Sequence, residues 1–237
     1  MIDVRRDEEI HEEDGGWFRA RWHFSFDRYV DPEYTQFGTL RVFNDDRLVP
    51  GVAWPMHPHR DIEGLTYVVE GTFEHADNLG LEDQLMILPA GSVQRMTLGS
   101  GAWHSERNAS QTEPMRFIQM WILPRERGLQ PWVEQKVFTK GDRTDRLLKV
   151  ISGEGGEAVF VHQDAAVYVS RLTPGTAVSH DLDRDRGVYF YVIAGSVTVN
   201  GGERMATGDA ARISDEGRLE IVAQEDSELI LVEVRLD

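Results

Sequence analysis

Two short stretches of the chain are spaced for a shared metal site. The first is His57-Pro58-His59 and the second is His104-Ser105-Glu106, so one residue separates the two potential ligands in each. Alternate side chains of a β-strand point to the same face, and two such strands facing each other would direct three imidazoles and a carboxylate into one space. The intervening Pro58 restricts His57 to an extended backbone and fixes its own φ, which orients both imidazoles. This donor set suits a first-row transition metal with open coordination positions.

The composition is that of a globular, acidic chain without cysteine. With 237 residues, of which 41% are hydrophobic, the chain has room for one large domain or for two of roughly 100 residues. Its net charge of −16 argues against nucleic acid and anionic membrane surfaces as partners. The absence of cysteine excludes disulfides and thiolate ligands. No signal-peptide core and no membrane-spanning apolar run is present, so we expect a cytoplasmic protein without membrane association.

Short apolar runs between turn residues predict an all-β fold. The runs are rich in β-branched and aromatic residues and are bounded by Gly, Pro, Asp or Asn. No long segment with helical periodicity competes with them, so we predict a β-sandwich or barrel. The predicted strands lie at residues 65–69, 84–88, 117–123, 188–193 and 229–234.

An internal repeat predicts two barrels of the same kind in tandem. The segment Tyr67–Gly71 (YVVEG) resembles Tyr191–Gly195 (YVIAG). Each is followed by a predicted hairpin and then by a turn of small residues, which ends at Gly91 in the first copy and at Gly208 in the second. The two halves of the chain therefore share one scaffold.

The second copy lacks the ligand set. The same spacing from Gly208 reaches Ile221 where the first copy has His104, and Ala223 takes the place of Glu106. Neither replacement can bind a metal through its side chain. We therefore expect the chemistry to be confined to the first copy.

A polar segment rich in Gly and Pro, between residues 124 and 141, is interpreted as the connection between the copies. We predict an N-terminal metal-binding barrel at residues 1–134 and a C-terminal barrel without metal ligands at residues 135–237. A chain with two such barrels can satisfy the barrel–barrel contact internally, so we expect a monomer.

The motifs around these ligands resemble those of the cupin superfamily, and of its pirin family in particular. Gly51-x5-His57-x-His59-x3-Glu63 resembles the first cupin motif, and Gly91 followed by His104-x3-Asn108 resembles the second. In many cupins the fourth ligand is the glutamate that matches Glu63. The sequence His104-Ser105-Glu106 instead resembles pirins, in which the glutamate after the last histidine takes that role.

The resemblance covers nearly the whole chain and implies a bicupin fold of two tandem jelly-roll barrels. It assigns His57, His59, His104 and Glu106 as the metal ligands. Glu63 is then a residue that supports the ligands or the fold, because it shares their face only if the strand continues unbroken through residues 60–62. Among the other histidines, His75 is expected to orient a ligand or to hold a hairpin, and His23 to lie in a core strand. The remaining ones are interpreted as incidental to the chemistry: His11, His162 and His180.

The resemblance to bacterial pirin-like quercetin 2,3-dioxygenases implies cleavage of a flavonol by O₂ with release of carbon monoxide. We expect one divalent transition metal, iron in the first place, with manganese, nickel, cobalt, copper and zinc as alternatives. Glu106 would be both a ligand and the general base that takes the proton of the flavonol 3-hydroxyl. The pocket for this small aromatic substrate should be apolar apart from the metal. Phe24, Phe26 and Met56 are considered as its lining, although core packing is the preferred role for each.

Two other functions stay open. Eukaryotic pirins are associated with transcriptional regulation, so the chain could be an iron-binding redox sensor that acts through a protein partner. Its acidic surface would suit a basic partner. The chain could also be a cupin enzyme that acts on another small metabolite.

Overall fold

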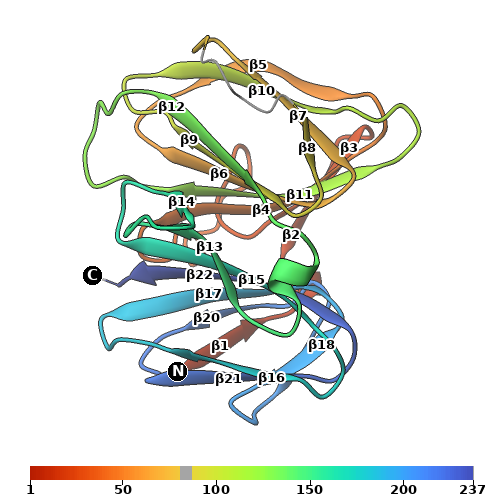
Figure 1. Ribbon diagram of the computed structural model, residues 1–237, viewed down its shortest axis with the longest axis vertical. Coiled ribbons are helices and arrows are strands. Elements are labelled where there is room, and N and C mark those ends of the chain that lie inside the picture. Colours follow the sequence, from red (N-terminus) through yellow and green to blue (C-terminus); the bar gives the residue numbers. More distant parts are fainter. Residues whose placement is uncertain (81–86, 237) are drawn as a thin grey trace. The chain divides into compact units, whose positions relative to one another are not determined.

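Alternating apolar and polar residues form antiparallel strands throughout the computed structural model, which describes residues 1–80 and 87–236. The strands make two compact units, each with a larger and a smaller sheet (Figure 1). The predicted all-β fold with two barrels is therefore confirmed. We call residues 11–138 and 153–163 the first barrel, and residues 1–10, 139–152 and 164–237 the second barrel.

The first barrel pairs its strands in the order β12-β9-β6-β11-β4-β3-β2 in the larger sheet and β5-β10-β7-β8 in the smaller one. Apolar side chains from both sheets, such as Phe73 and Phe117, pack between them. The strands are β2 (His11–Asp14), β3 (Phe18–Trp22), β4 (Leu40–Leu48), β5 (Ala53–His59), β6 (Glu63–Glu70), β7 (Thr72–Asp77), β8 (Ile87–Pro89), β9 (Ser92–Thr97), β10 (Ala102–Asn108), β11 (Met115–Ile122) and β12 (Trp132–Val137).

The second barrel repeats this order. Its larger sheet contains β1-β20-β17-β22-β15-β13, and its smaller sheet is β16-β21-β18-β19. Strand by strand, β20, β17 and β22 correspond to β9, β6 and β11, which confirms the repeat seen in the sequence. The strands are β1 (Ile2–Arg5), β13 (Leu148–Ser152), β15 (Ala165–Leu172), β16 (Ala177–Asp181), β17 (Arg186–Ala194), β18 (Ser196–Val199), β19 (Arg204–Ala206), β20 (Ala210–Ile213), β21 (Arg218–Ala223) and β22 (Ser227–Arg235).

Most of the predicted strands fall inside observed ones. Residues 65–69 lie in β6, residues 188–193 in β17 and residues 229–234 in β22. The run at 117–123 lies in β11 except for its last residue. Of the run at 84–88, residues 87 and 88 begin β8, and residues 84–86 lie outside the described part of the chain.

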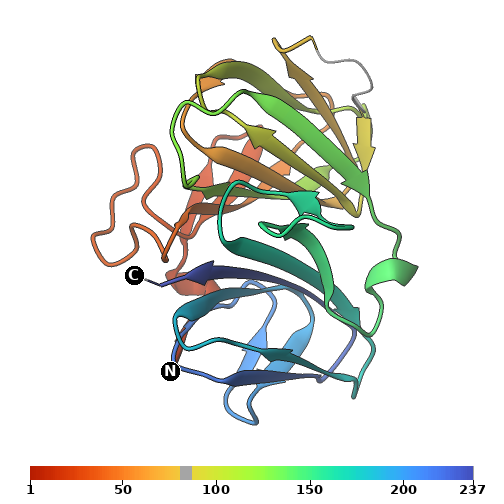
Figure 2. The same cartoon turned by 60° about the vertical axis from the view of Figure 1, so that its left-hand side comes forward.

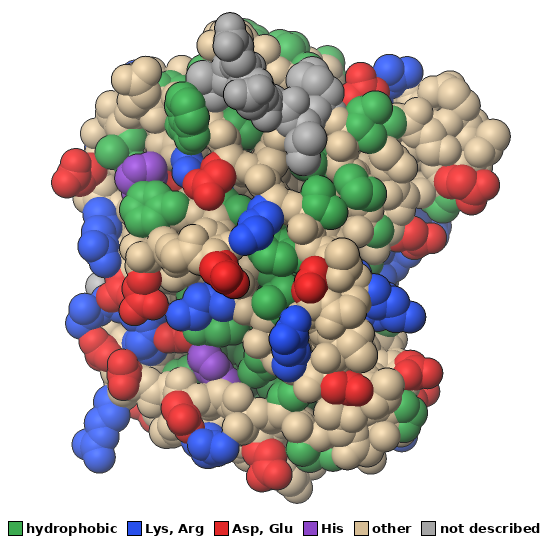
Figure 3. Space-filling model, in the orientation of Figure 1, with side chains coloured by type: hydrophobic (Ala, Val, Ile, Leu, Met, Phe, Trp, Pro, Cys, Tyr) green, Lys and Arg blue, Asp and Glu red, His purple; other side chains and the backbone are tan. Residues whose placement is uncertain are grey.

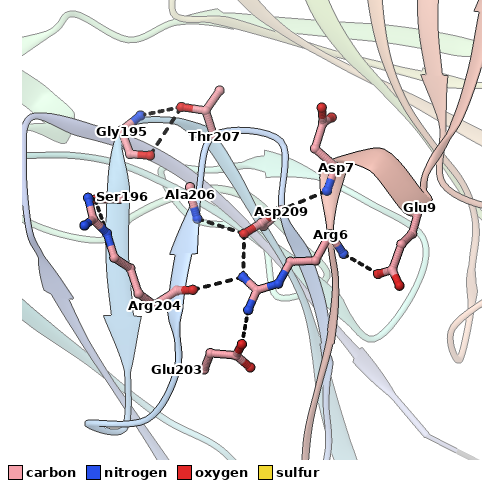
Figure 4. A network of polar contacts seen from close by, with 10 residues as sticks. All are labelled: Arg6, Asp7, Glu9, Gly195, Ser196, Glu203, Arg204, Ala206, Thr207 and Asp209. Atoms are coloured by element: carbon pink, nitrogen blue, oxygen red, sulfur yellow. Dashed lines mark hydrogen bonds and ion pairs between the residues drawn. The ribbon is translucent and has the colours of Figure 1, made fainter.

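The first residues of the chain belong to the second barrel. Strand β1 pairs with β20, with Ile2 opposite Ile213 and Arg5 opposite Ala210. Arg6 then donates to the Asp209 carboxylate over 2.7 Å, and the same carboxylate accepts the backbone N–H of Asp7 (Figure 4). The 3₁₀ turn η1 (Asp7–Glu9) follows these contacts. Strand β1 thus takes the place beside β20 that β12 takes beside β9.

Residues 153–163, which follow β13 in the chain, belong to the first barrel. They contain β14 (Val159–Phe160), whose Phe160 carbonyl accepts a hydrogen bond from Arg95 over 2.8 Å. Farther along, the Gln163 side chain donates to the carbonyl of Leu123 over 2.7 Å. The sequence predicted a boundary after residue 134. In the structure β12 continues to Val137, residues 1–10 belong to the second barrel, and residues 153–163 belong to the first.

The interior of the second barrel is filled with apolar side chains. Ile221 and Ala223, which stand where the first copy has His104 and Glu106, are both buried in this core together with Leu219. Counting back from Gly195 by the spacing that separates Gly71 from His57 reaches Asp181, which is exposed and pairs with Arg218 at the surface. The ligand positions of the second copy thus contribute to packing and to the surface.

Charged side chains of both signs are interspersed over the face seen in Figure 3. The excess of acidic residues is therefore not gathered into one patch on this face. Within the described residues, no helical segment has the length and apolar character that crossing a bilayer requires.

Two glycines of the repeat occupy equivalent tight turns in the two barrels. Gly71 (φ +78°) lies between β6 and β7, and Gly195 (φ +84°) lies between β17 and β18. A Cβ atom on Gly71 would lie 2.5 Å from the carbonyl oxygen of Pro114. Close backbone approach and positive φ both require glycine at this position.

We expect Gly71→Ala to destabilise the first barrel more than Gly16→Ala does. Gly16 has nearly the same φ (+81°), but nothing lies within 4 Å of its Cβ position. The left-handed backbone should cost about 1–2 kcal/mol in each variant, and only Gly71→Ala adds the clash. Urea unfolding followed by tryptophan fluorescence measures both, and equal losses would contradict the steric argument.

Candidate metal centre

The two ligand stretches lie on neighbouring antiparallel strands of the smaller sheet of the first barrel. His57 and His59 are on β5, and His104 and Glu106 are on β10. His104 lies directly opposite His57, whereas Glu106 lies opposite Trp54. Between these pairs β5 has one residue more than β10, which is a β-bulge, and bulges redirect side chains next to them.

The three imidazoles converge on one point. The ring centroids of His57 and His104 are 4.5 Å apart, and that of His59 is 4.8 Å from the first and 5.3 Å from the second. One ring nitrogen from each histidine lies within 4.8 Å of the other two. In the described part of the chain, no other group of histidine and carboxylate side chains has this arrangement.

The ring of His57 is held by the backbone next to the bulge. Its Nδ1–H donates to the carbonyl oxygen of Pro55 over 2.8 Å. The proton on Nδ1 leaves Nε2 with a lone pair, which is the form of imidazole that binds a metal. The bulge thus supplies both the position and the tautomer of this histidine.

The surroundings of His104 fit a metal ligand. The residue is 4% exposed, and neither of its ring nitrogens has a hydrogen-bond partner among the described residues. Buried polar groups in proteins are nearly always paired, so two unpaired nitrogens on one buried ring call for a partner. A metal ion bound between the three imidazoles would be the partner of one of these nitrogens.

Burial and neighbouring imidazoles keep His59 and His104 neutral. Burial, with His57 beside it, lowers the pKa of His59 to about 4. Burial and then the neighbouring imidazoles lower the pKa of His104 to about 2. Neutral imidazole is the ligand form, so at neutral pH no proton has to leave these rings before a cation binds.

Glu106 is the carboxylate nearest to the histidines. Its Oε1 lies 3.7 Å from Nδ1 of His104, and its Oε2 lies 4.0 Å from Nε2 of His57. Burial raises the pKa of this carboxyl to about 7. A divalent cation would stabilise the carboxylate form, because it supplies the positive charge that the surroundings lack.

Glu63 belongs to a different network. Strand β5 ends at His59, and Asp61 (φ +54°) turns the chain before β6 begins at Glu63, so the strand is not continuous through residues 60–62. The fully buried Glu63 carboxylate accepts a hydrogen bond from Thr97 over 3.3 Å, and its other oxygen lies 3.3 Å from Nδ1 of His162.

Arg95 completes this network. Its Nε lies 3.8 Å from the Glu63 carboxylate, and its terminal nitrogen donates to Glu134 over 2.9 Å. His162, which the sequence analysis regards as incidental, joins the network from the segment 153–163. The contact between His162 and Glu63 links residues far apart in the sequence, so no local sequence pattern could predict it.

A cavity of about 800 Å³ opens beside the histidines, inside the first barrel. His57, His59 and Glu106 line it from the smaller sheet. Aromatic residues make up much of the remaining wall, and one of them, Trp121, packs edge-on against His59 with ring centroids 4.7 Å apart. The aromatic lining residues are Phe18, Trp22, Phe26, Trp54, Phe117 and Trp121.

The residues considered for the pocket have different positions. Phe26 lines the cavity from the connection between β3 and β4, residues 23–39, which is a long loop (Figure 2). Phe24 is buried in the core, and the side chain of Met56 is 45% exposed. Core packing was thus the right expectation for Phe24 only.

Two of the other histidines are buried inside the first barrel. His75 on β7 is fully buried, with Nδ1 3.6 Å from the Asp77 carboxylate and its ring 5.8 Å from that of His104. His23 is fully buried against Phe43, as expected for a core residue. Whether His75 orients a ligand stays a prediction.

The cavity also has polar walls that the sequence analysis missed. Asn44 and Asp46 of β4 and Gln119 of β11 line it from the larger sheet. Asn44-Asp45-Asp46 is a run of three polar residues in a strand, a pattern that would have marked them as unusual. Only the strand pairing shows which of the three face the cavity.

The sequence and the fold are both similar to those of known proteins. The sequence matches the family described as Pirin over residues 3–122 and the family described as Quercetinase C-terminal cupin domain over residues 149–234. A pirin-like protein from Caulobacter vibrioides is 40% identical over 235 residues, which are 98% of this chain and 99% of that protein. A quercetin 2,3-dioxygenase from Escherichia coli K12 is 39% identical over 235 residues, 99% of each chain.

A solved structure is similar over the full length. It is that of the bacterial pirin YhhW from Escherichia coli in complex with nickel(II), with a TM-score of 0.91 and 36% sequence identity. The similarity covers 100% of both chains.

We expect Glu106→Gln to weaken binding of Ni²⁺ and Glu63→Gln to leave it within about threefold. An amide is a poorer ligand for a divalent cation than a carboxylate, so removing a ligand charge should cost at least about tenfold in affinity. Glu63→Gln should instead lower the thermal unfolding midpoint, because it weakens the contacts with Arg95 and His162. Titration calorimetry with Ni²⁺ measures the affinity of both variants. A loss of affinity in Glu63→Gln and not in Glu106→Gln would identify Glu63 as the ligand.

Proposed function

Since this chain belongs to the pirin family, we propose that it is a metal-dependent dioxygenase that cleaves a flavonol such as quercetin with O₂ and releases carbon monoxide. The observation that carries the proposal is the position of the three histidines and Glu106 at the wall of an aromatic cavity. A metal there would meet a flat ligand directly.

The proposed ligands are His57, His59, His104 and Glu106. The two unpaired nitrogens of buried His104 and the lowered pKa values of His59 and His104 support this set. Iron stays our expectation for the metal, and nickel, which is bound by the related YhhW, is an alternative. When bound, the metal would supply a coordination site for the flavonol oxygens and a route for electrons to O₂.

The walls of the cavity would hold the flavonol rings. Trp54 lines it beside the histidines, and Phe117 and Trp121 line it from β11. Large apolar rings favour a flat aromatic ligand through burial of apolar surface and through stacking. They also exclude water, which strengthens the electrostatic interactions at the reacting oxygens.

Glu106 would receive the proton of the flavonol 3-hydroxyl. The carboxylate lines the cavity next to His57. A flavonol oxygen placed beside the three imidazoles would therefore be within reach of Glu106. Loss of the proton makes the flavonol electron-rich, which is the form that reacts with O₂.

We expect the metal-loaded protein to consume O₂ and quercetin in equal amounts and to release carbon monoxide. His57→Ala should lower the rate by at least about 100-fold, because it removes a ligand. Quercetin absorbance, an oxygen electrode and trapping of carbon monoxide by haemoglobin follow the reaction, with metal-free wild type as the control.

Two results would separate the errors in this proposal. If the metal is bound and quercetin survives in the presence of O₂, the flavonol assignment is wrong, and a different small metabolite becomes the substrate to seek. If neither wild type nor His57→Ala binds a metal, the site itself is misinterpreted.

A further inference from the structure

A polar strip crosses the floor of the aromatic cavity, opposite the histidines. Strand β4 presents Asn44 and Asp46 to the cavity, and Gln119 of β11 lies directly beside Asn44 in the sheet. Phe117 lies beside Asp46 in the same way. The three histidines and Glu106 lie on the smaller sheet and this strip lies on the larger one, so a ligand in the cavity would contact both.

The sequence alternation explains why these residues face inward. Between them, Asp45 points to the other side of the sheet, where its carboxylate accepts hydrogen bonds from the guanidinium of Arg116, one of them over 2.9 Å. Residues 44 and 46 share the opposite face because side chains alternate along a strand. The inward pair therefore has no part in the ion pair that anchors β4 to β11.

Asn44 is buried without a complete set of partners. The residue is 3% exposed, and its Oδ1 has no hydrogen-bond partner among the described residues. An unpaired buried amide oxygen destabilises the fold, because it has lost its bonds to water. A polar group that lines a ligand cavity in this state is suited to accept a hydrogen bond from the ligand.

Asp46 is in a similar position. It is 5% exposed, and burial first and then Asp45 and Glu106 raise its pKa well above the usual value for an aspartate. None of these influences is a hydrogen bond or a positive charge from a described residue. A carboxyl group accepts hydrogen bonds through its oxygens, so Asp46 suits the hydroxyl groups of a ligand.

Gln119 completes the strip as a donor. Its Oε1 accepts a hydrogen bond from the hydroxyl of Thr66 over 3.0 Å. The amide nitrogen is then the end of this side chain that can donate to a ligand. The strip therefore offers acceptors on Asn44 and Asp46 and a donor on Gln119.

We propose that Asn44 and Asp46, assisted by Gln119, bind the ring hydroxyl groups of the substrate and so make the site selective for polyhydroxylated aromatic compounds. The inference rests on the proposed function in taking the occupant to be a flavonol. It adds the part of the flavonol that is recognised, which is distinct from the oxygens next to the metal. A wholly apolar cavity would not discriminate between hydroxylated and bare rings, whereas buried polar groups reject a ligand that leaves them unpaired.

The test compares two ligands in the full-length, Ni²⁺-loaded protein without O₂, so that no turnover occurs. Quercetin carries hydroxyls on both ring systems, whereas 3-hydroxyflavone keeps only the oxygens that would face the metal. We expect wild type to bind quercetin at least about tenfold more tightly, which is the effect of one well-made hydrogen bond. Quenching of tryptophan fluorescence measures both affinities.

Substitutions then assign the preference to the strip. Asn44→Leu and Asp46→Leu should each reduce the preference to less than about threefold, since neither can form a hydrogen bond. Asp46→Asn should retain it, because an amide both donates and accepts. Glu126→Gln, an exposed charge change in the same barrel, should leave it unaltered.

Unfolding temperatures separate binding from a structural role. Removal of an unpaired buried polar group should leave the midpoint of the leucine variants unchanged or raise it. If both leucine variants instead lower the midpoint, or if the wild type binds the two flavonols equally, the proposal is overturned. If the protein prefers quercetin over 3-hydroxyflavone but does not turn quercetin over in O₂, the proposed dioxygenase is contradicted and the role of the strip is supported. If it turns quercetin over but binds the two flavonols equally, the dioxygenase is supported and the role of the strip is contradicted.

Discussion

The register that sets His104 opposite His57 is the constraint on which the rest of the site depends. A slip of one residue between β5 and β10 would turn every side chain to the other face and separate the imidazoles. The bulge after this pair adds a second condition, because it places the Pro55 carbonyl where the His57 ring can donate to it. The pairing of β5 with β10 and the β-bulge between them thus determine which side-chain atoms meet at the site.

The two barrels use the same strand order for opposite purposes. In the second barrel, Ile221 and Ala223 close the interior by packing, and the result is a continuous apolar core. In the first barrel, His104 and Glu106 stand at those positions next to an open cavity, and two of the buried nitrogens have no partner. Buried polar groups of this kind lower stability, so the first barrel gives up packing where the second does not.

The sequence predicted most of the fold because its signals are local and repeated. Alternation, turn glycines and the YVVEG and YVIAG copies identified the strands and the two barrels, and the spacing of the histidines identified the cluster. Other parts depend on contacts between distant segments. The meeting of Glu63 with His162 and the inward direction of Asn44 and Asp46 follow from strand pairing, which a single sequence does not display. The resemblance, rather than any spacing, selected Glu106 over Glu63.

The pairing of β1 with β20 has a consequence for the order in which the two barrels can fold during synthesis. Residues 2–5 are made before the first barrel, but their partners in β20 are made after it. All segments of the first barrel leave the ribosome earlier, by residue 163. The first barrel can therefore fold during synthesis, while β1 waits as an unpaired strand until β20 has been made.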